Sequence, residues 1–211
     1  KKSKLPATID TSKIKFDKVN VPSTWQRTGY EIPEYINTPY GFDNRKFGGE
    51  WGKGVRPPEL PEDFSCGIYR KFINIEDKTK NYVLTFLGIT PCVDLYVNGV
   101  FVGFGEGAHN SYEFDVTEYL KEGENEILAV VFKWSIGSYL EAQDMFRENG
   151  IFRDVLLYTY EKSYINDFEA VAEKKGKKYN LNIKAEVKGG VKNATVKASL
   201  YDGKNLVAEG E

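Results

Sequence analysis

The chain has 211 residues, and its 29 basic and 31 acidic side chains give a formal net charge of −2. This near-neutral balance supplies no basic surface for nucleic acid or for an anionic membrane. A single histidine, His109, excludes a histidine-rich metal site, and Cys66 and Cys92 are too few for a disulfide scaffold or a four-cysteine zinc site. The two cysteines could pair, but we interpret them as small buried hydrophobic residues. No run of about 18 apolar residues predicts a membrane-spanning helix.

The start of the chain indicates a piece of a longer protein. It begins with Lys1-Lys2, and its only methionine is the internal Met145. We therefore expect a processed or excised chain. Its sequence leaves the compartment of the parent protein unknown, with the cytoplasm slightly favoured.

The first sixty residues combine prolines with large aromatic side chains. Prolines at this density forbid a long helix and interrupt sheet ladders, so we predict ordered loop with short extended pieces. A long aromatic loop can build a binding surface, or it can seal the edge of a sheet. Both interpretations stay open for these prolines and aromatics: Pro22, Pro33, Pro39, Pro57, Pro58, Pro61, Trp25, Tyr30, Tyr35, Tyr40, Phe42, Phe47 and Trp51.

From residue 65 onward the sequence predicts one strand after another. Asn98-Gly99 separates two β-branched runs and supplies the two positive φ angles of a type I′ hairpin turn. Asp115 or Thr117 can cap a short turn that ends at Leu120. About seven short strands without a long helix predict an all-β jelly-roll sandwich over residues 1–161. The expected strands are 66–75, 82–87, 93–97, 100–104, 112–116, 126–132 and 151–160.

Residues 162–211 differ in composition and pattern, because they form lysine-rich runs in which apolar and polar residues alternate. Leu181, Ile183, Ala185 and Val187 alternate with polar residues, and so do residues 196–201. This period of two predicts one half of a two-sheet sandwich. Because an immunoglobulin-like sandwich needs about 100 residues, we expect a truncated domain of this type. Its few strands would be frayed unless a neighbour packs against them.

The segment 133–154 holds the residues that could carry chemistry. Its aromatic, acidic and arginine side chains suit a sugar, because apolar ring faces pack beneath and carboxylates bind hydroxyls. Glu141 and Asp144 lie too close in sequence to flank a scissile bond from opposite sides, as a retaining glycosidase requires. An ion pair of Asp144 with Arg147 or Arg153 is the structural alternative. His109 is interpreted as a loop residue rather than a catalytic base.

Several stretches, in this order, resemble the N-terminal part of family 2 glycoside hydrolases, specifically the large β-galactosidases. They cover about residues 16–160, and the last is close to a signature of the family. The stretches are VPSTWQRTGYEIP (21–33), YINTPY (35–40), CGIYRKF (66–72), VDLYVNGVFVG (93–103), YEFDVTEYL (112–120) and WSIGSYLEAQDMFRENGIFRDV (134–155).

This resemblance implies a sugar-binding jelly roll, then an immunoglobulin-like sandwich, then a barrel with the catalytic glutamates. The barrel lies outside this chain, so the resemblance implies no catalytic residue here and an inactive fragment. It also implies that Asn37 and Asp144 reach the substrate in the barrel and that Asp144 helps to hold a sodium ion. Sodium and magnesium are the ions implied for the intact enzyme, which is expected to be a homo-oligomer that hydrolyses terminal β-galactosides with retention.

The chain departs from the family pattern at Ile136, Ala142 and Phe146, which puts fine substrate specificity in doubt. Two other hypotheses stay open. One is an autonomous carbohydrate-binding module, which the jelly-roll prediction permits. The other is a family 2 parent of different specificity, such as a β-glucuronidase or a β-mannosidase.

Overall fold

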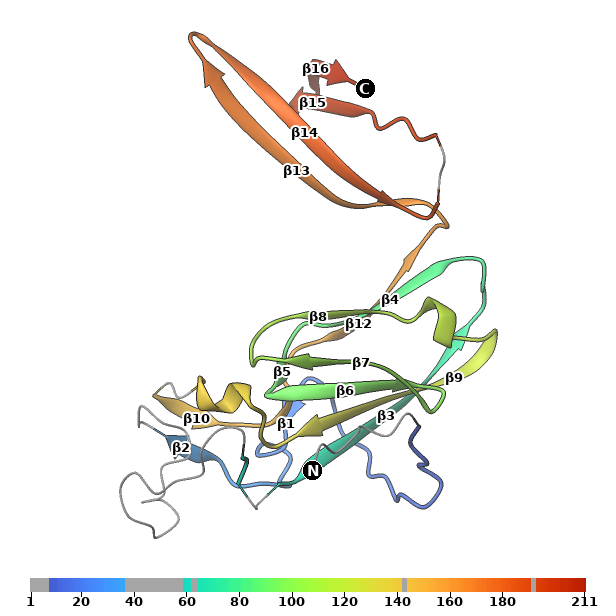
Figure 1. Cartoon of the computed structure of the whole chain (residues 1–211), viewed down its shortest axis with the longest axis vertical. Coiled ribbons are helices and arrows are strands. Elements are labelled where there is room, and N and C mark those ends of the chain that lie inside the picture. Colours follow the sequence, from blue (N-terminus) through green and yellow to red (C-terminus); the bar gives the residue numbers. More distant parts are fainter. Residues whose placement is uncertain (1–7, 37–58, 62–63, 142–143, 191–192) are drawn as a thin grey trace. The chain divides into compact units, whose positions relative to one another are not determined.

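The computed structural model describes residues 8–36, 59–61, 64–141, 144–190 and 193–211. The chain divides into two compact units, Lys1–Thr159 and Tyr160–Glu211. Strands make up nearly all the regular structure of the described residues, and the helical turns among these residues are short 3₁₀ segments (Figure 1). Within the described ranges, no helix is long and apolar enough to cross a membrane. The predicted all-β fold class is confirmed.

The described residues of the first unit form twelve strands. They are β1 (Ser23–Thr24), β2 (Glu34–Ile36), β3 (Cys66–Ile75), β4 (Asn81–Phe86), β5 (Ile89–Thr90), β6 (Cys92–Val97), β7 (Val100–Glu106), β8 (Tyr112–Asp115), β9 (Gly123–Phe132), β10 (Met145–Arg147), β11 (Gly150–Ile151) and β12 (Val155–Tyr160), whose last residue opens the second unit. The described residues also form two 3₁₀ turns, η2 (Thr117–Tyr119) and η3 (Gly137–Tyr139).

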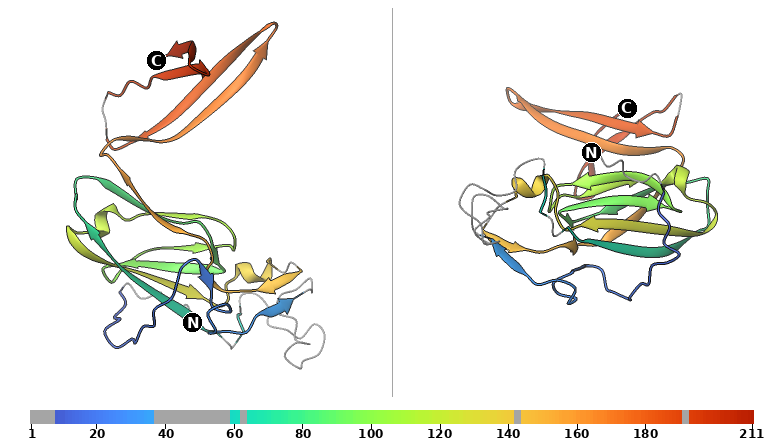
Figure 2. Two further views of the ribbon diagram at one scale, coloured as in Figure 1. Left: turned by 180° about the vertical axis from the view of Figure 1, so that it is seen from behind. Right: turned by 60° about the horizontal axis from the view of Figure 1, so that its bottom comes forward.

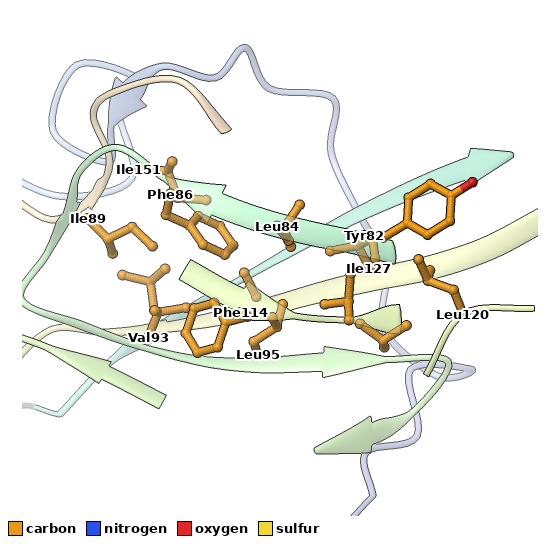
Figure 3. Close-up of a cluster of buried hydrophobic side chains, with 14 of the residues drawn as sticks. Tyr82, Leu84, Phe86, Ile89, Val93, Leu95, Phe114, Leu120, Ile127 and Ile151 are labelled. Atoms are coloured by element: carbon orange, nitrogen blue, oxygen red, sulfur yellow. The ribbon is translucent and has the colours of Figure 1, made fainter. Parts of the chain in front are cut away.

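Two open sheets enclose the main hydrophobic core. One has the strand order β3-β9-β6-β7 and the other has the order β12-β4-β8. Figure 3 shows side chains of β4 and β8 pointing toward those of β6 and β9, with Leu84, Phe86 and Phe114 opposite Val93 and Leu95. All five side chains are at most 9% exposed. Removing such apolar surface from water is the main driving force for this fold.

The central strands β6 and β9 are buried on both faces. Val93, Leu95 and Val97 of β6 belong to the main core, whereas Tyr96 packs on the opposite face with Leu128 and Val130 of β9. Residues of the N-terminal segment cover that outer face, and they include Ile9 and Phe16. Because neither face meets water there, apolar residues follow one another without alternation over residues 95–97 of β6 and 127–131 of β9.

The hairpin predicted at Asn98-Gly99 is confirmed. Asn98 has φ 50° and Gly99 has φ 81°, as the type I′ turn between β6 and β7 requires. The Asn98 side chain also donates to the Tyr119 carbonyl at 2.9 Å and accepts from the Glu126 amide at 3.0 Å. The turn therefore joins the β6–β7 hairpin to β9 and to η2, which is the short turn predicted between Thr117 and Leu120.

The expectation of one strand over residues 151–160 is wrong. β11 ends at Ile151 and β12 begins at Val155, because the chain moves from the small β1-β11-β5 sheet to the β12-β4-β8 sheet. Between them, the amides of Phe152 and Arg153 donate to the Gly88 carbonyl at 3.2 and 3.4 Å. Periodicity alone does not reveal such a change of sheet.

The cysteines are free thiols, and the interpretation of both as buried is wrong for Cys66. Cys66 in β3 is exposed, whereas Cys92 in β6 is half-buried. Both lie opposite Phe132 of β9, on its two sides. Adjacent strands are about 4.8 Å apart, so two strand spacings exceed the reach of a disulfide. Burial raises the pKa of the Cys92 thiol to about 12, which leaves it protonated and unreactive.

Where the structure describes it, the second unit forms two hairpins, β13 (Tyr164–Lys175) with β14 (Lys178–Lys188) and β15 (Ala198–Asp202) with β16 (Asn205–Gly210). Leu181, Ile183 and Ala185 lie directly opposite Ala172, Ala170 and Phe168, so these apolar side chains share one face. The chain turns near residues 176, 189–190 and 203 at glycines whose φ angles lie between 59° and 104°. Most side chains of this unit are exposed.

Candidate functional site

A two-stranded ribbon at one end of the first unit brings together two motifs that are distant in sequence. β2 pairs with β10 in antiparallel register, with Tyr35 opposite Phe146 and Glu34 opposite Arg147. The ribbon lies at the same end in each view, beside η3 (Figures 1 and 2). It carries the start of the YINTPY motif on one strand and the end of the QDMF motif on the other.

Tyr35, Asp144 and Phe146 form one exposed cluster on this ribbon. The Tyr35 hydroxyl donates to Oδ1 of Asp144, and the Tyr35 and Phe146 rings lie 5.5 Å apart between centroids at an angle of 58°. Tyr35 is 51% exposed and Phe146 is 57% exposed, so apolar ring surface stays open to solvent beside a carboxylate. This combination matches what a saccharide needs, since sugars present apolar C–H faces and hydroxyl edges.

The carboxylate of Asp144 also changes the acidity of its partner. It raises the pKa of the Tyr35 hydroxyl above the usual value of 10.0, chiefly through the hydrogen bond and further through its negative charge. Ionised Tyr35 would lose this hydrogen bond and face a second negative charge. Near neutral pH the phenol therefore remains a hydrogen-bond donor.

A hydrogen-bond network around Asn149 anchors the ribbon to the sandwich. Asn149 accepts from the Trp25 amide at 2.8 Å and exchanges two bonds with the Gln26 side chain, at 2.9 and 3.1 Å. Its side-chain amide donates to the Lys133 carbonyl at 2.8 Å, and the Lys133 ammonium is 3.5 Å from Glu31. Because this network is largely buried, it fixes the C-terminal end of β10 relative to the strands beneath it.

A cavity of about 360 Å³ lies next to the ribbon. Glu141, on its wall, accepts a hydrogen bond from the Ala108 amide through Oε1 at 2.6 Å. The other oxygen of Glu141 and the Nε and Nη2 atoms of Arg147 are closed off from solvent and make no hydrogen bond with the residues that the structure describes. Burial lowers the pKa of Arg147, and the negative charge of Glu141 opposes that shift. The residues lining the cavity are Thr24, Thr90, Ala108, His109, Glu141, Met145, Phe146, Arg147, Glu148 and Phe152.

The structure separates the candidates that the sequence grouped together. Glu141 binds the backbone at Ala108, whereas Asp144 binds Tyr35, so the two carboxylates have different partners. Among the described contacts Asp144 makes no ion pair with Arg147 or with Arg153, and Arg153 donates to the carbonyls of Leu87 and His109.

Two other sequence candidates occupy different positions. His109 lies in a turn with φ 71° and its ring packs against Phe152, with 5.2 Å between centroids. Asn37 lies outside the described residues, so its expected contact with substrate stays a prediction.

Sequence reasoning missed the Tyr35–Asp144 hydrogen bond and the buried polar atoms of Arg147. In the sequence Tyr35 is one aromatic residue of a proline-rich segment and the first residue of YINTPY, and neither pattern pairs it with Asp144. The signal that the sequence offers for the pairing of β2 with β10 is that both segments are short and flanked by turn residues, as in strands that pair as a ribbon. Which short segments pair depends on tertiary packing, and the sequence pattern does not encode it locally.

Comparison with known proteins identifies the family. The model described as "Glycosyl hydrolases family 2, sugar binding domain" matches residues 6–161. A β-galactosidase of Actinobacillus pleuropneumoniae is 40% identical over 169 residues, which cover 80% of this chain and 16% of that protein. A β-galactosidase of Streptococcus thermophilus is 32% identical over 212 residues, covering 96% of this chain and 20% of that protein. The chain therefore spans a fifth or less of the length of these relatives.

Solved structures share the fold at low sequence identity. A β-glucuronidase of Bacteroides uniformis superposes with a TM-score of 0.59 and 19% identity, covering 87% of this chain and 20% of that chain. A Bifidobacterium dentium β-glucuronidase complexed with coumarin-3-O-glucuronide has a TM-score of 0.55 and 22% identity, covering 67% of this chain and 30% of that chain. These likenesses establish the sandwich fold alone. With the matched family model covering most of its length, the chain belongs to glycoside hydrolase family 2 and contains the sugar-binding domain of that family.

Proposed function

We propose that this chain contributes substrate-contacting loops to a β-galactosidase whose catalytic residues lie elsewhere in the intact protein. The observation that carries the proposal is the exposed cluster of Tyr35, Asp144 and Phe146 on the β2–β10 ribbon. The relatives named β-galactosidase support this substrate class, as does the resemblance of the YINTPY and QDMF motifs.

In this role Asp144 would accept hydrogen bonds from sugar hydroxyls, and Phe146 would cover an apolar face of the sugar. Such contacts lower the barrier by fixing the substrate in a reactive position rather than by moving a proton. The reaction itself would be retaining hydrolysis through a covalent glycosyl-enzyme, with both catalytic carboxylates outside residues 1–211. The isolated chain is then inactive.

The donor set around Asp144 suits a monovalent cation only in part. A carboxylate and a phenol are oxygen donors, which hard cations prefer. No group of three or more His, Cys, Asp or Glu side chains is placed to hold a metal ion in the described part of the chain. Asp144 would therefore be one ligand of a sodium ion, and the remaining ligands would come from elsewhere in the intact enzyme.

The test compares variants of the full-length parent on an aryl β-galactoside and on an aryl β-glucuronide. We expect the parent to cleave the galactoside and Asp144→Asn to lower kcat/KM by about 10- to 100-fold, the loss of a hydrogen bond to a charged group. The matched control is Glu118→Gln, which neutralises an exposed carboxylate in η2 and should leave kcat/KM unchanged.

Three results would contradict the proposal in different ways. Glucuronide cleavage by the parent would favour the β-glucuronidase hypothesis. Turnover by the 211-residue chain would show that its own carboxylates are catalytic. Saturable galactose binding by the isolated chain, without any effect of Asp144→Asn on the parent, would favour an autonomous carbohydrate-binding module.

A further inference from the structure

Two oppositely charged residues stand at the two ends of the segment that carries Asp144. Glu141 precedes Asp144 by three residues and Arg147 follows it by three. Both line the cavity beside the ribbon, and each holds at least one polar atom that is closed off from solvent and has no hydrogen-bond partner in the described part of the chain. Buried polar groups without partners are uncommon in folded proteins, so these atoms call for an explanation.

Each of the two residues is fixed by a different part of the fold. Glu141 is held by the backbone amide of Ala108, which lies in the turn after β7. Arg147 belongs to β10, where it lies opposite Glu34 of β2. Attraction between their charges therefore acts between the body of the sandwich and the ribbon. Because water is excluded from these atoms, that attraction is stronger than it would be between exposed side chains.

We propose that Glu141 and Arg147 are positioning residues, whose buried opposite charges hold the β2–β10 ribbon against the sandwich so that the Asp144 carboxylate keeps its hydrogen bond with Tyr35. The inference rests on the proposed function, in which Asp144 contacts the substrate. It adds the residues that keep Asp144 in place, although neither of them touches the substrate. A purely structural role would instead make the pair important for the stability of the whole first unit, with no specific effect at Tyr35.

The hydroxyl of Tyr35 offers a local readout of the position of Asp144. Its pKa is raised by the hydrogen bond to Asp144, so it reports whether that contact is made. The experiment uses the 211-residue chain with tyrosines ¹³C-labelled at Cζ, and follows the Tyr35 signal by NMR during a pH titration. Tyr35→Phe assigns the signal, and Asp144→Asn gives the value of Tyr35 without the carboxylate.

The variants are Glu141→Gln, Arg147→Met and Arg147→Lys. Glu141→Gln can keep the Ala108 hydrogen bond through its amide oxygen while removing the negative charge. Arg147→Lys keeps the positive charge that Arg147→Met removes. The matched control is Glu148→Gln, which removes a negative charge from the wall of the same cavity without altering the pair.

The sign of the shift in Arg147→Met separates positioning from direct electrostatics. Loss of a nearby positive charge by itself raises the pKa of a tyrosine. Loss of the Asp144 contact lowers it instead. We expect the Tyr35 pKa to fall toward the Asp144→Asn value in Glu141→Gln and in Arg147→Met, and to stay near the wild-type value in Arg147→Lys and in Glu148→Gln.

Two outcomes would overturn the proposal. One is a wild-type or raised Tyr35 pKa in Arg147→Met together with an unchanged pKa in Glu141→Gln. The other is loss of the folded ¹H–¹⁵N spectrum in both variants, which would assign the pair to overall stability. Because the titration involves no substrate, a fall of the Tyr35 pKa would support positioning even if Asp144→Asn had no effect on the parent enzyme, a result that would contradict only the proposed function.

Discussion

Replacing Gly67 by alanine tests how tightly the VPSTWQ motif is packed against the sandwich. Gly67 lies in β3, and a Cβ atom there would be 2.7 Å from Cζ2 of Trp25 and 2.8 Å from its Cε2 and Nε1. Ordinary van der Waals contact lies between 3.4 and 4 Å, so the indole must move. Trp25 resists this movement because it is 6% exposed, its Nε1 donates to the Tyr69 hydroxyl at 2.8 Å and its amide donates to Asn149.

The expected cost follows from overpacking of a buried ring. Inserting a methyl group into a well-packed core destabilises a protein by about 1–3 kcal/mol. With a urea m-value of about 2 kcal/mol per M, a loss of 2 kcal/mol lowers the unfolding midpoint by about 1 M. Tryptophan fluorescence is a suitable probe, since all three tryptophans lie in the first unit. Gly210→Ala is the control, because a Cβ atom at Gly210 meets nothing within 4 Å.

A double variant shows whether Trp25 is the cause. Leucine at position 25 lacks all three atoms that the new Cβ would approach, so Gly67→Ala should cost less in a Trp25→Leu background than in the wild type. The coupling should be about 0.5–3 kcal/mol in the compensating direction. An unchanged midpoint for Gly67→Ala, or strict additivity in the double variant, would refute the reasoning.

Two further predictions concern pH and local stability. Asp94 in β6 is 5% exposed, and burial raises the pKa of its carboxyl from 3.8 to about 6. The folded state therefore binds this proton more tightly than the unfolded chain does, so the contribution of Asp94 to stability is greatest below about pH 4 and falls as pH rises to about 6. Relative to Asp94→Asn, the free energy of unfolding of the wild type should fall by about 1–3 kcal/mol between pH 4 and pH 7, as measured by urea titrations. Parallel pH profiles of the two proteins would contradict this prediction. In the second unit, amide hydrogen exchange over residues 181–200 should be faster than in β6 and β9, because the side chains of this unit are largely exposed. Equal protection would contradict this and show that the second unit is as stable as the sandwich.

The parts of the fold that local rules govern were predictable from the sequence. Asn98-Gly99 predicted its hairpin because few other residue pairs adopt two positive φ angles cheaply, and apolar runs of strand length predicted β4, β6 and β9. The change of sheet after Ile151 and the exposure of Cys66 were not predictable, because they depend on which strands become neighbours. Asp144 was found through a motif, whereas its partner Tyr35 required the register of two three-residue strands.

The N-terminal segment that covers the outer face of the β3-β9-β6-β7 sheet also affects the solubility of the domain. Tyr96, Leu128 and Val130 are shielded by a segment without extended regular structure, which is attached by the Thr8–Val100 bridge and by the bond from the Ile9 amide to the Gly99 carbonyl. A chain shortened to begin after Phe16 would keep both sheets of the sandwich yet present a continuous apolar surface to solvent. Such surfaces drive self-association, so the N-terminal segment sets the solubility of this domain as well as completing its fold.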